Sequence, residues 1–166
     1  MPLRGIVQGL LLLVLSGEAY AASDWETFTS RYSGCSVDYP SPIFNPSQQR
    51  DPDGATTFTS SLTGASMVLA GGSSDKRASV ASIVRTYLEQ VKGESITYRR
   101  QEPGWAVYSG YRNGSIYYLK IILSNNRRQA CVLELKYPPA NKGELDVAVS
   151  RISRSLRVPQ TSLVAR

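Results

Sequence analysis

The sequence predicts an α+β fold, a mainly antiparallel β-sheet of about six to seven strands with two main helices packed on it. Short runs that alternate apolar and polar residues, bounded by proline or glycine, predict the strands. Two longer segments, 79–92 and 142–156, repeat apolar residues every three or four positions, which predicts helices. Several strands follow one another through tight turns, and this order favours antiparallel pairing.

The first predicted strands lie on either side of a proline-rich loop. Residues 23–33 are a polar lead in which Trp25 and Phe28 are expected to dock against the core. The first predicted strand is 35–39, which ends at Pro40. Residues 56–61 and 65–71 predict a hairpin. The two glycines at 71–72 break the alternation, so we expect a flexible turn there.

Each predicted helix carries one continuous apolar stripe, which is expected to face the sheet. In 79–92 the stripe consists of Val80, Ile83, Val84, Tyr87, Leu88 and Val91. In 142–156 it consists of Leu145, Ala148, Val149, Ile152 and Leu156. A row of arginines recurs every three positions on a different side of the second helix: Arg151, Arg154 and Arg157.

A second hairpin follows a short strand predicted at 96–100. Residues 105–111 and 115–123 are joined through Asn-Gly at 113–114, which is a strong signal for a two-residue turn. That turn would place Tyr111 opposite Ile116. Both faces of this hairpin are largely apolar, so we expect central strands covered above and below.

Residues 1–22 have the pattern of a signal peptide. A positive charge precedes a short apolar run, and small residues stand where signal peptidase reads the chain. We expect cleavage after Ala21 or Ala22 and a periplasmic or secreted protein. The run is shorter than the roughly 20 residues that span a bilayer, although an N-terminal membrane anchor is the alternative. Residues 23–158 would then form a single α+β domain, and 159–166 a flexible tail.

The chain contains two cysteines, and each lies on the apolar side of a predicted strand. Cys35 shares a strand face with Val37, and Cys131 shares one with Leu133 in a strand over 131–137. Two cysteines in an exported chain predict one disulfide, between Cys35 and Cys131. The alternative is a pair of buried free thiols.

Composition narrows the classes of function. The chain has no histidine, which excludes Ser-His and Cys-His nucleophiles and the usual zinc sites. No other spacing of polar residues predicts a catalytic, metal or cofactor site, so we expect no enzyme and no cofactor. The net charge of +6 is explained either by solubility alone or by binding to an anionic surface. Export argues against nucleic acid as the partner.

Tyrosine is unusually frequent, with ten Tyr against three Phe. Tyrosines and arginines alternate in the region after the first helix, and both residue types are enriched in protein-binding hot spots. The candidate binding residues there are Tyr98, Arg99, Arg100, Tyr108, Tyr111 and Arg112. The alternative is that these tyrosines belong to the core and keep only the hydroxyl wet, which we expect for Tyr117. Arg151 and Arg154 are candidates for contact with an anionic ligand or lipid.

Several phrases of the sequence resemble the PsbP-like fold, an α/β/α sandwich. The matching phrases are CSVDYPSPIF, SVASIVRTYLEQVKG, GSIYYLKIIL, CVLELKYPP and AVSRISRSLRV, which together span most of the chain after residue 22. The chain also looks like small uncharacterised periplasmic proteins of Gram-negative bacteria. The resemblance implies a binding or accessory role rather than catalysis.

These observations lead to two functional hypotheses. The first is an exported, monomeric, non-enzymatic domain that binds another envelope protein through the Tyr/Arg-rich sheet surface. The second is a periplasmic protein that binds a small ligand or an anionic lipid.

Overall fold

The computed structural model describes residue 21 and residues 24–47, 54–73, 76–89 and 94–159. In these ranges the strands are β1 (Trp25–Thr29), β2 (Ser36–Pro40), β3 (Asn45–Pro46), β4 (Thr56–Thr59), β5 (Ser66–Ser73), β6 (Glu94–Glu102), β7 (Trp105–Arg112), β8 (Ser115–Leu123) and β9 (Gln129–Tyr137). The helices are α1 (Val80–Glu89), the 3-10 turn η2 (Pro139–Asn141) and α2 (Lys142–Ser155).

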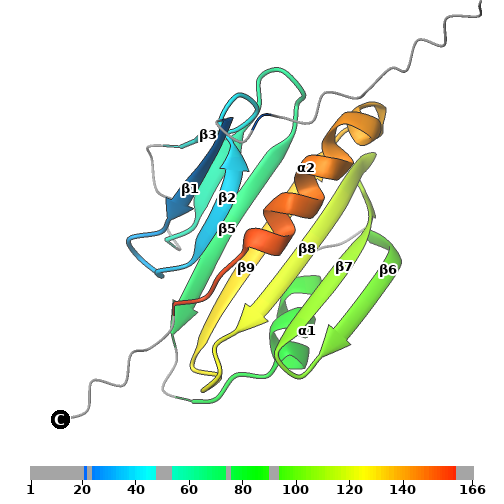
Figure 1. The fold of residues 1–166 in the computed structure, drawn as a ribbon. Helices are drawn as coiled ribbons and strands as arrows, with labels where there is room; N and C mark the ends of the chain where they lie inside the picture. The colour runs from blue at the N-terminus through cyan, green and yellow to red at the C-terminus, as the bar shows by residue number, and fades with distance from the viewer. Residues whose placement is uncertain (1–20, 22–23, 48–53, 74–75, 90–93, 160–166) are drawn as a thin grey trace, which may run out of the picture.

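A seven-stranded antiparallel sheet in the order β3-β4-β5-β9-β8-β7-β6 forms the middle layer of the described chain (Figure 1). Helix α2 and the two-stranded β1–β2 sheet cover one face, where they enclose the larger apolar core. Helix α1 covers the other face and encloses a second core with β7 and β8. The predicted α+β sandwich is therefore confirmed.

Strand β8 shows why the sheet needs cover on both faces. Tyr117, Leu119 and Ile121 point into the core under α1. Ile116 lies in the core under α2, and Tyr118 packs against it. Because alternate residues of a strand point to opposite faces, a strand that is apolar at nearly every position must be buried on both sides. The expectation of strands covered above and below is confirmed for β8 but is wrong for β7, which is buried on its α1 side alone.

The turn between β7 and β8 also follows the sequence signal. Tyr111 pairs with Ile116, as the two-residue turn requires. Asn113 and Gly114 both have positive φ angles, 49° and 78°. Asparagine and glycine tolerate this conformation better than other residues, which is why Asn-Gly favours such a hairpin.

Two expectations about the first half of the chain are wrong. The polar lead contains β1, which pairs antiparallel with β2. The glycines at 71–72 do not form a turn, because β5 continues through them to Ser73 and pairs with β9 over this whole length. The larger core reaches β1 through Trp25 and Phe28, which pack against it.

The disulfide joins the two sheets. Cys35, which directly precedes β2, is bonded to Cys131 of β9, with 5.8 Å between the Cα atoms. Both cysteines are almost fully buried, at 1% and 0% exposure. The predicted pairing is confirmed, and the alternative of free thiols is wrong.

The expected signal peptide and C-terminal tail lie almost entirely outside the described residues, apart from Ala21 and Pro159. Within the described ranges, no helix is long and apolar enough to cross a membrane.

Candidate functional site

The Tyr/Arg-rich region divides between the two faces of the sheet. Residues directly opposite each other on paired strands share a face. Tyr98 pairs with Ser109, and Tyr111 pairs with Ser95, so both tyrosines lie on the α2 side. Arg99 instead pairs with Tyr108, which belongs to the core under α1. The candidate residues therefore do not form one continuous surface.

We name the α2-side set Tyr98, Arg100, Trp105 and Tyr111 the meander patch. Strand β6 is one of the two edges of the described sheet, and α2 lies over β8 and β9 without covering β6 and β7 (Figure 1). Tyr98 and Tyr111 consequently remain 52% and 48% exposed. The guanidinium of Arg100 stacks 5.2 Å from the centre of the Trp105 ring. Such stacking presents a flat surface of aromatic and guanidinium planes.

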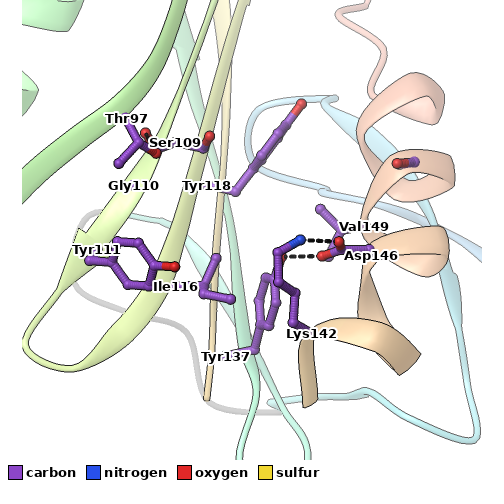
Figure 2. A pocket seen from close by; sticks show the side chains of 11 residues that line it. Thr97, Ser109, Gly110, Tyr111, Ile116, Tyr118, Tyr137, Lys142, Asp146 and Val149 are labelled. Carbon is purple, nitrogen blue, oxygen red and sulfur yellow. Dashed lines mark hydrogen bonds and ion pairs between the residues drawn. The ribbon is translucent and has the colours of Figure 1, made fainter. Parts of the chain in front are cut away.

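A groove of about 360 Å³ adjoins this patch, between α2 and the strands (Figure 2). Its lining combines hydroxyl groups, a few apolar side chains and one ion pair: Thr97, Ser109, Gly110, Tyr111, Ile116, Tyr118, Tyr137, Lys142, Asp146, Val149 and Ser150. Tyr111 belongs to both the groove and the meander patch. The two features therefore form one connected site.

Asp146 organises one wall of the groove. Its carboxylate accepts a hydrogen bond from the Tyr137 hydroxyl at 3.0 Å and pairs with Lys142 one helical turn earlier (Figure 2). Burial raises the pKa of Tyr137 well above its usual range, and the hydrogen bond to Asp146 raises it further. Tyr137 therefore stays a neutral donor at physiological pH, which does not favour a role as a nucleophile.

The other wall of the groove is held by contacts between β8 and α2. The Tyr118 hydroxyl lies 2.5 Å from the Ser153 hydroxyl. Burial raises the Tyr118 pKa, while the hydrogen bond to Ser153 opposes this. Lys120 donates to the Ser153 carbonyl at 2.6 Å, and burial lowers its pKa. These bonds fix the distance between helix and sheet at the groove.

On the α1 face, two candidate binding residues serve the packing of the fold. Tyr108 is 7% exposed, and its hydroxyl donates to Gln101 at 2.9 Å. Arg112 pairs with the nearly buried Glu134 at 3.3 Å, and Lys136 pairs with the same carboxylate at 2.9 Å. Arg99 is exposed on this face.

The row of arginines predicted on the second helix is also partly engaged within the fold, and its last member, Arg157, lies beyond the end of α2 in a bridge with Ser36. The Arg151 guanidinium stacks 4.0 Å from the centre of the Trp25 ring, which fastens β1 to the helix. Arg157 pairs with Asp38 at 3.4 Å. Arg154 is exposed.

Of the residues that line the groove, only Tyr111 is among the predicted binding residues. The side chains that shape its walls are not: Tyr118, Tyr137, Lys142 and Asp146. The spacing of Lys142 and Asp146 predicts an ion pair on a helix surface. Nothing local, however, predicts that this pair faces the end of β9. In the described part of the chain, no group of three or more cysteine, aspartate or glutamate side chains could hold a metal ion.

Comparison with known proteins identifies the fold. No protein-family model matches the sequence, and no curated protein matches it. The Ran-binding protein Mog1p of Saccharomyces cerevisiae is similar in structure, with a TM-score of 0.58, 11% identity and coverage of 84% of this chain and 97% of that chain. A cyanobacterial PsbP (CyanoP) from Synechocystis aligns with a TM-score of 0.54, 12% identity and coverage of 88% and 99%. A structure from Bacteroides thetaiotaomicron aligns with a TM-score of 0.51, 14% identity and coverage of 83% and 50%. These similarities show that the chain has the PsbP/Mog1 fold.

Proposed function

We propose that this chain is an exported, non-enzymatic binding domain that contacts another envelope protein through the meander patch. The observation that carries the proposal is the pair of half-exposed tyrosines, Tyr98 and Tyr111, beside the Arg100–Trp105 stack. Large aromatic and arginine side chains dominate protein-binding hot spots because they contribute much contact area for few rotatable bonds. The signal-peptide pattern of residues 1–22 supports export.

The fold supports a protein-binding role by analogy. One solved structure with this fold is a Ran-binding protein. Fold alone does not specify a partner, so the partner must be argued from the surface of this chain. The patch lies on one face of the sheet, so the partner is expected to contact Tyr98 and Tyr111 together while Arg99, on the opposite face, stays free of it.

The groove gives this surface a recess. A side chain of the partner could enter between Tyr111 and α2, where hydroxyls and the Lys142–Asp146 pair offer hydrogen bonds. Hot-spot residues are commonly seated in such recesses and surrounded by contacts that exclude water. The exposed tyrosines around the mouth would supply that surrounding ring.

A crosslinking experiment tests the proposal. A photoreactive amino acid at position 98 or 111 should capture the same envelope protein, whereas the same group at position 32 should not. Tyr32 is a matched control because it is 67% exposed and lies in the β1–β2 turn. With the captured protein purified, Tyr98→Ala and Tyr111→Ala should each weaken binding by roughly tenfold or more, as expected for hot-spot residues. Unchanged affinity in both variants would refute the proposal.

A small ligand in the groove is the second candidate function. The volume of about 360 Å³ is in the range of small-molecule sites, and the lining places hydrogen-bonding groups among tyrosine rings. Protein purified from the envelope and then denatured should release a small molecule detectable by mass spectrometry. A Ser150→Tyr variant, which would fill the groove, should release none; an equal yield from this variant would exclude the groove.

A further inference from the structure

Three connecting segments meet at one end of the sheet. The residues before α1 and the turn between β8 and β9 lie at the lower end of the molecule in Figure 1, and the turn between β1 and β2 lies to the left, beside the last part of β5. The Ala78 amide donates to the Arg127 carbonyl at 2.7 Å, which joins the residues before α1 to the β8–β9 turn. A Cβ on Gly71 would lie 3.0 Å from the Ser33 Cβ, which places the β1–β2 turn beside β5.

These segments carry a concentration of exposed cations. The cations are Arg31, Lys76, Arg77, Arg127 and Arg128. The described residues of the same segments, 30–35, 76–79 and 124–128, contain no aspartate or glutamate. We name this surface the basic end. Its five cations are among the 19 lysines and arginines of the sequence.

The opposite end of the sheet carries several carboxylates. Asp24 and Glu26 lie where β1 begins, and Glu144 and Asp146 lie where α2 begins. Lys142 at this end already pairs with Asp146. Arg112 and Lys136 also lie towards this end and pair with Glu134, so cations and carboxylates nearly balance there. The described residues of the basic end, in contrast, carry cations alone.

The turn that presents two of these cations is well ordered. Ser124 and Asn126 bond to each other at 2.7 Å, and the Arg128 amide donates to Asn126 at 3.0 Å. The Arg127 amide donates to the Ser124 carbonyl at 2.8 Å, which holds Arg127 at a φ of 58°. A positive φ is uncommon for arginine and persists only where neighbouring bonds fix it. Arg127 and Arg128 thus project from a fixed turn.

We propose that the basic end docks on a membrane surface through the phosphate groups of anionic phospholipids. Guanidinium groups match phosphate oxygens in geometry and charge. The cations are spread over the tips of three separate segments, an arrangement that suits a broad anionic surface. The opposite end has no such excess of cations, because Arg112, Lys136 and Lys142 pair with carboxylates there. The strands are therefore expected to stand upright on the membrane, with the meander patch facing sideways. The inference uses the expected export of the chain and is independent of any protein partner.

Each cation near an anionic membrane surface increases partitioning by a factor of about five. The test measures sedimentation of the mature chain with phosphatidylcholine vesicles, with and without phosphatidylglycerol. Binding should require phosphatidylglycerol and fall steeply with salt. Arg128→Ser should weaken vesicle binding about fivefold. Arg85, an exposed arginine on α1, is the control, and Arg85→Ser should weaken vesicle binding less than about twofold.

A second variant keeps the test independent of the β8–β9 turn. Lys76→Ser with Arg77→Ser should weaken vesicle binding by roughly 25-fold, because two cations are lost. Adding inorganic phosphate at matched ionic strength distinguishes a membrane surface from a site for free phosphate. Vesicle binding should stay unchanged if the basic end recognises a surface, and should fall if phosphate occupies a specific site. Equal losses for Arg128→Ser and Arg85→Ser, competition by phosphate, or no binding at low salt would each overturn the proposal.

Discussion

Gly71 of β5 lies directly against Cys35: a Cβ on Gly71 would be 2.3 Å from the Cys35 Sγ. The same Cβ would be 2.8 Å from the Ala130 carbonyl oxygen of β9. No side-chain atom fits in this space. Strand β5 can therefore pass the disulfide and keep its pairing with β9 only because residue 71 is glycine.

We expect Gly71→Ala to lower the free energy of unfolding by about 1–3 kcal/mol, because the methyl group must displace either the disulfide or β9. Gly72→Ala is the control, since nothing lies within 4 Å of a Cβ at the next position of the same strand. That variant should be neutral or slightly stabilising. Urea unfolding of both variants measures the difference, and equal stabilities would contradict the packing argument.

Reduction of the Cys35–Cys131 bond should lower the free energy of unfolding more than Gly71→Ala does. The cysteines are 96 residues apart, and closing a loop of this length stabilises a fold by up to about 4–5 kcal/mol in the chain-entropy model. Adding a reductant should lower the urea midpoint of the wild-type chain. The double variant Cys35→Ser, Cys131→Ser should unfold at the lower midpoint with or without reductant. If the urea midpoint of the wild-type chain is the same with and without reductant, a structural role for the bond is contradicted.

Much of this fold is predictable from local patterns. Both helices and β9 show clear periodicity because each packs one face against a core, and β8 is apolar at nearly every position because both of its faces are buried. Strand β1 was missed since its Trp25 and Phe28 are three residues apart and give no period of two. Two successive glycines favour a turn, whereas the reason for Gly71, the nearby disulfide, is not local in sequence.

The candidate site was predictable only in part. Tyr117 lies in the core as expected, at 1% exposure, but its hydroxyl is buried there rather than exposed to water. The division of Tyr98 and Arg99 between two faces depends on the register of β6, which contains an irregularity between Ile96 and Tyr98. The position of α2 over β8 and β9 creates the groove, and no local pattern specifies that position. Composition therefore indicates the Tyr/Arg-rich strands as the binding region. Which of their side chains share one face depends on strand register and on the position of α2.

Gly110 links this irregularity to the meander patch. A Cβ on Gly110 would lie 1.8 Å from the Ser95 carbonyl oxygen, so Gly110→Ala should push β6 away from β7. Amide hydrogens of β6 should exchange faster, while those of β9 stay protected. Gly104→Ala, in the β6–β7 turn with nothing within 4 Å, should leave both unchanged. Unchanged exchange in the Gly110 variant would refute the close approach.

Glu134 connects three elements on the α1 face. It accepts from Tyr87 of α1, and it pairs with Arg112 of β7 and with Lys136. We expect Glu134→Ala to lower stability by about 1–3 kcal/mol, because the charged hydrogen bonds of a nearly buried carboxylate are lost. Glu102→Ala is the control; its exposed pair with Arg100 should contribute less than about 1 kcal/mol. Equal losses in thermal or urea unfolding would argue against a special role for Glu134.

The last prediction concerns alkaline pH. The Tyr39 hydroxyl donates to Glu26 at 3.0 Å, and burial, followed by the bond and charge of Glu26, raises the pKa of Tyr39 from 10.0 to about 12. A pKa raised in the folded state means that the unfolded chain loses its proton first. The stabilisation is therefore complete below pH 10 and is lost as the pH rises towards 12.

Between these values the free energy of unfolding should fall by up to about 1.4 kcal/mol per pH unit for each tyrosine that behaves in this way. Tyr137, raised in the same direction beside Asp146, adds to the slope. Lys120 acts oppositely, because its lowered pKa relieves a cost as the pH rises. Tyr39→Phe should consequently show a shallower decline than the wild-type chain in urea unfolding at pH 10 to 11.5. Identical slopes for the two proteins would mean that Tyr39 ionises at its ordinary pKa and that its contact with Glu26 does not persist in solution.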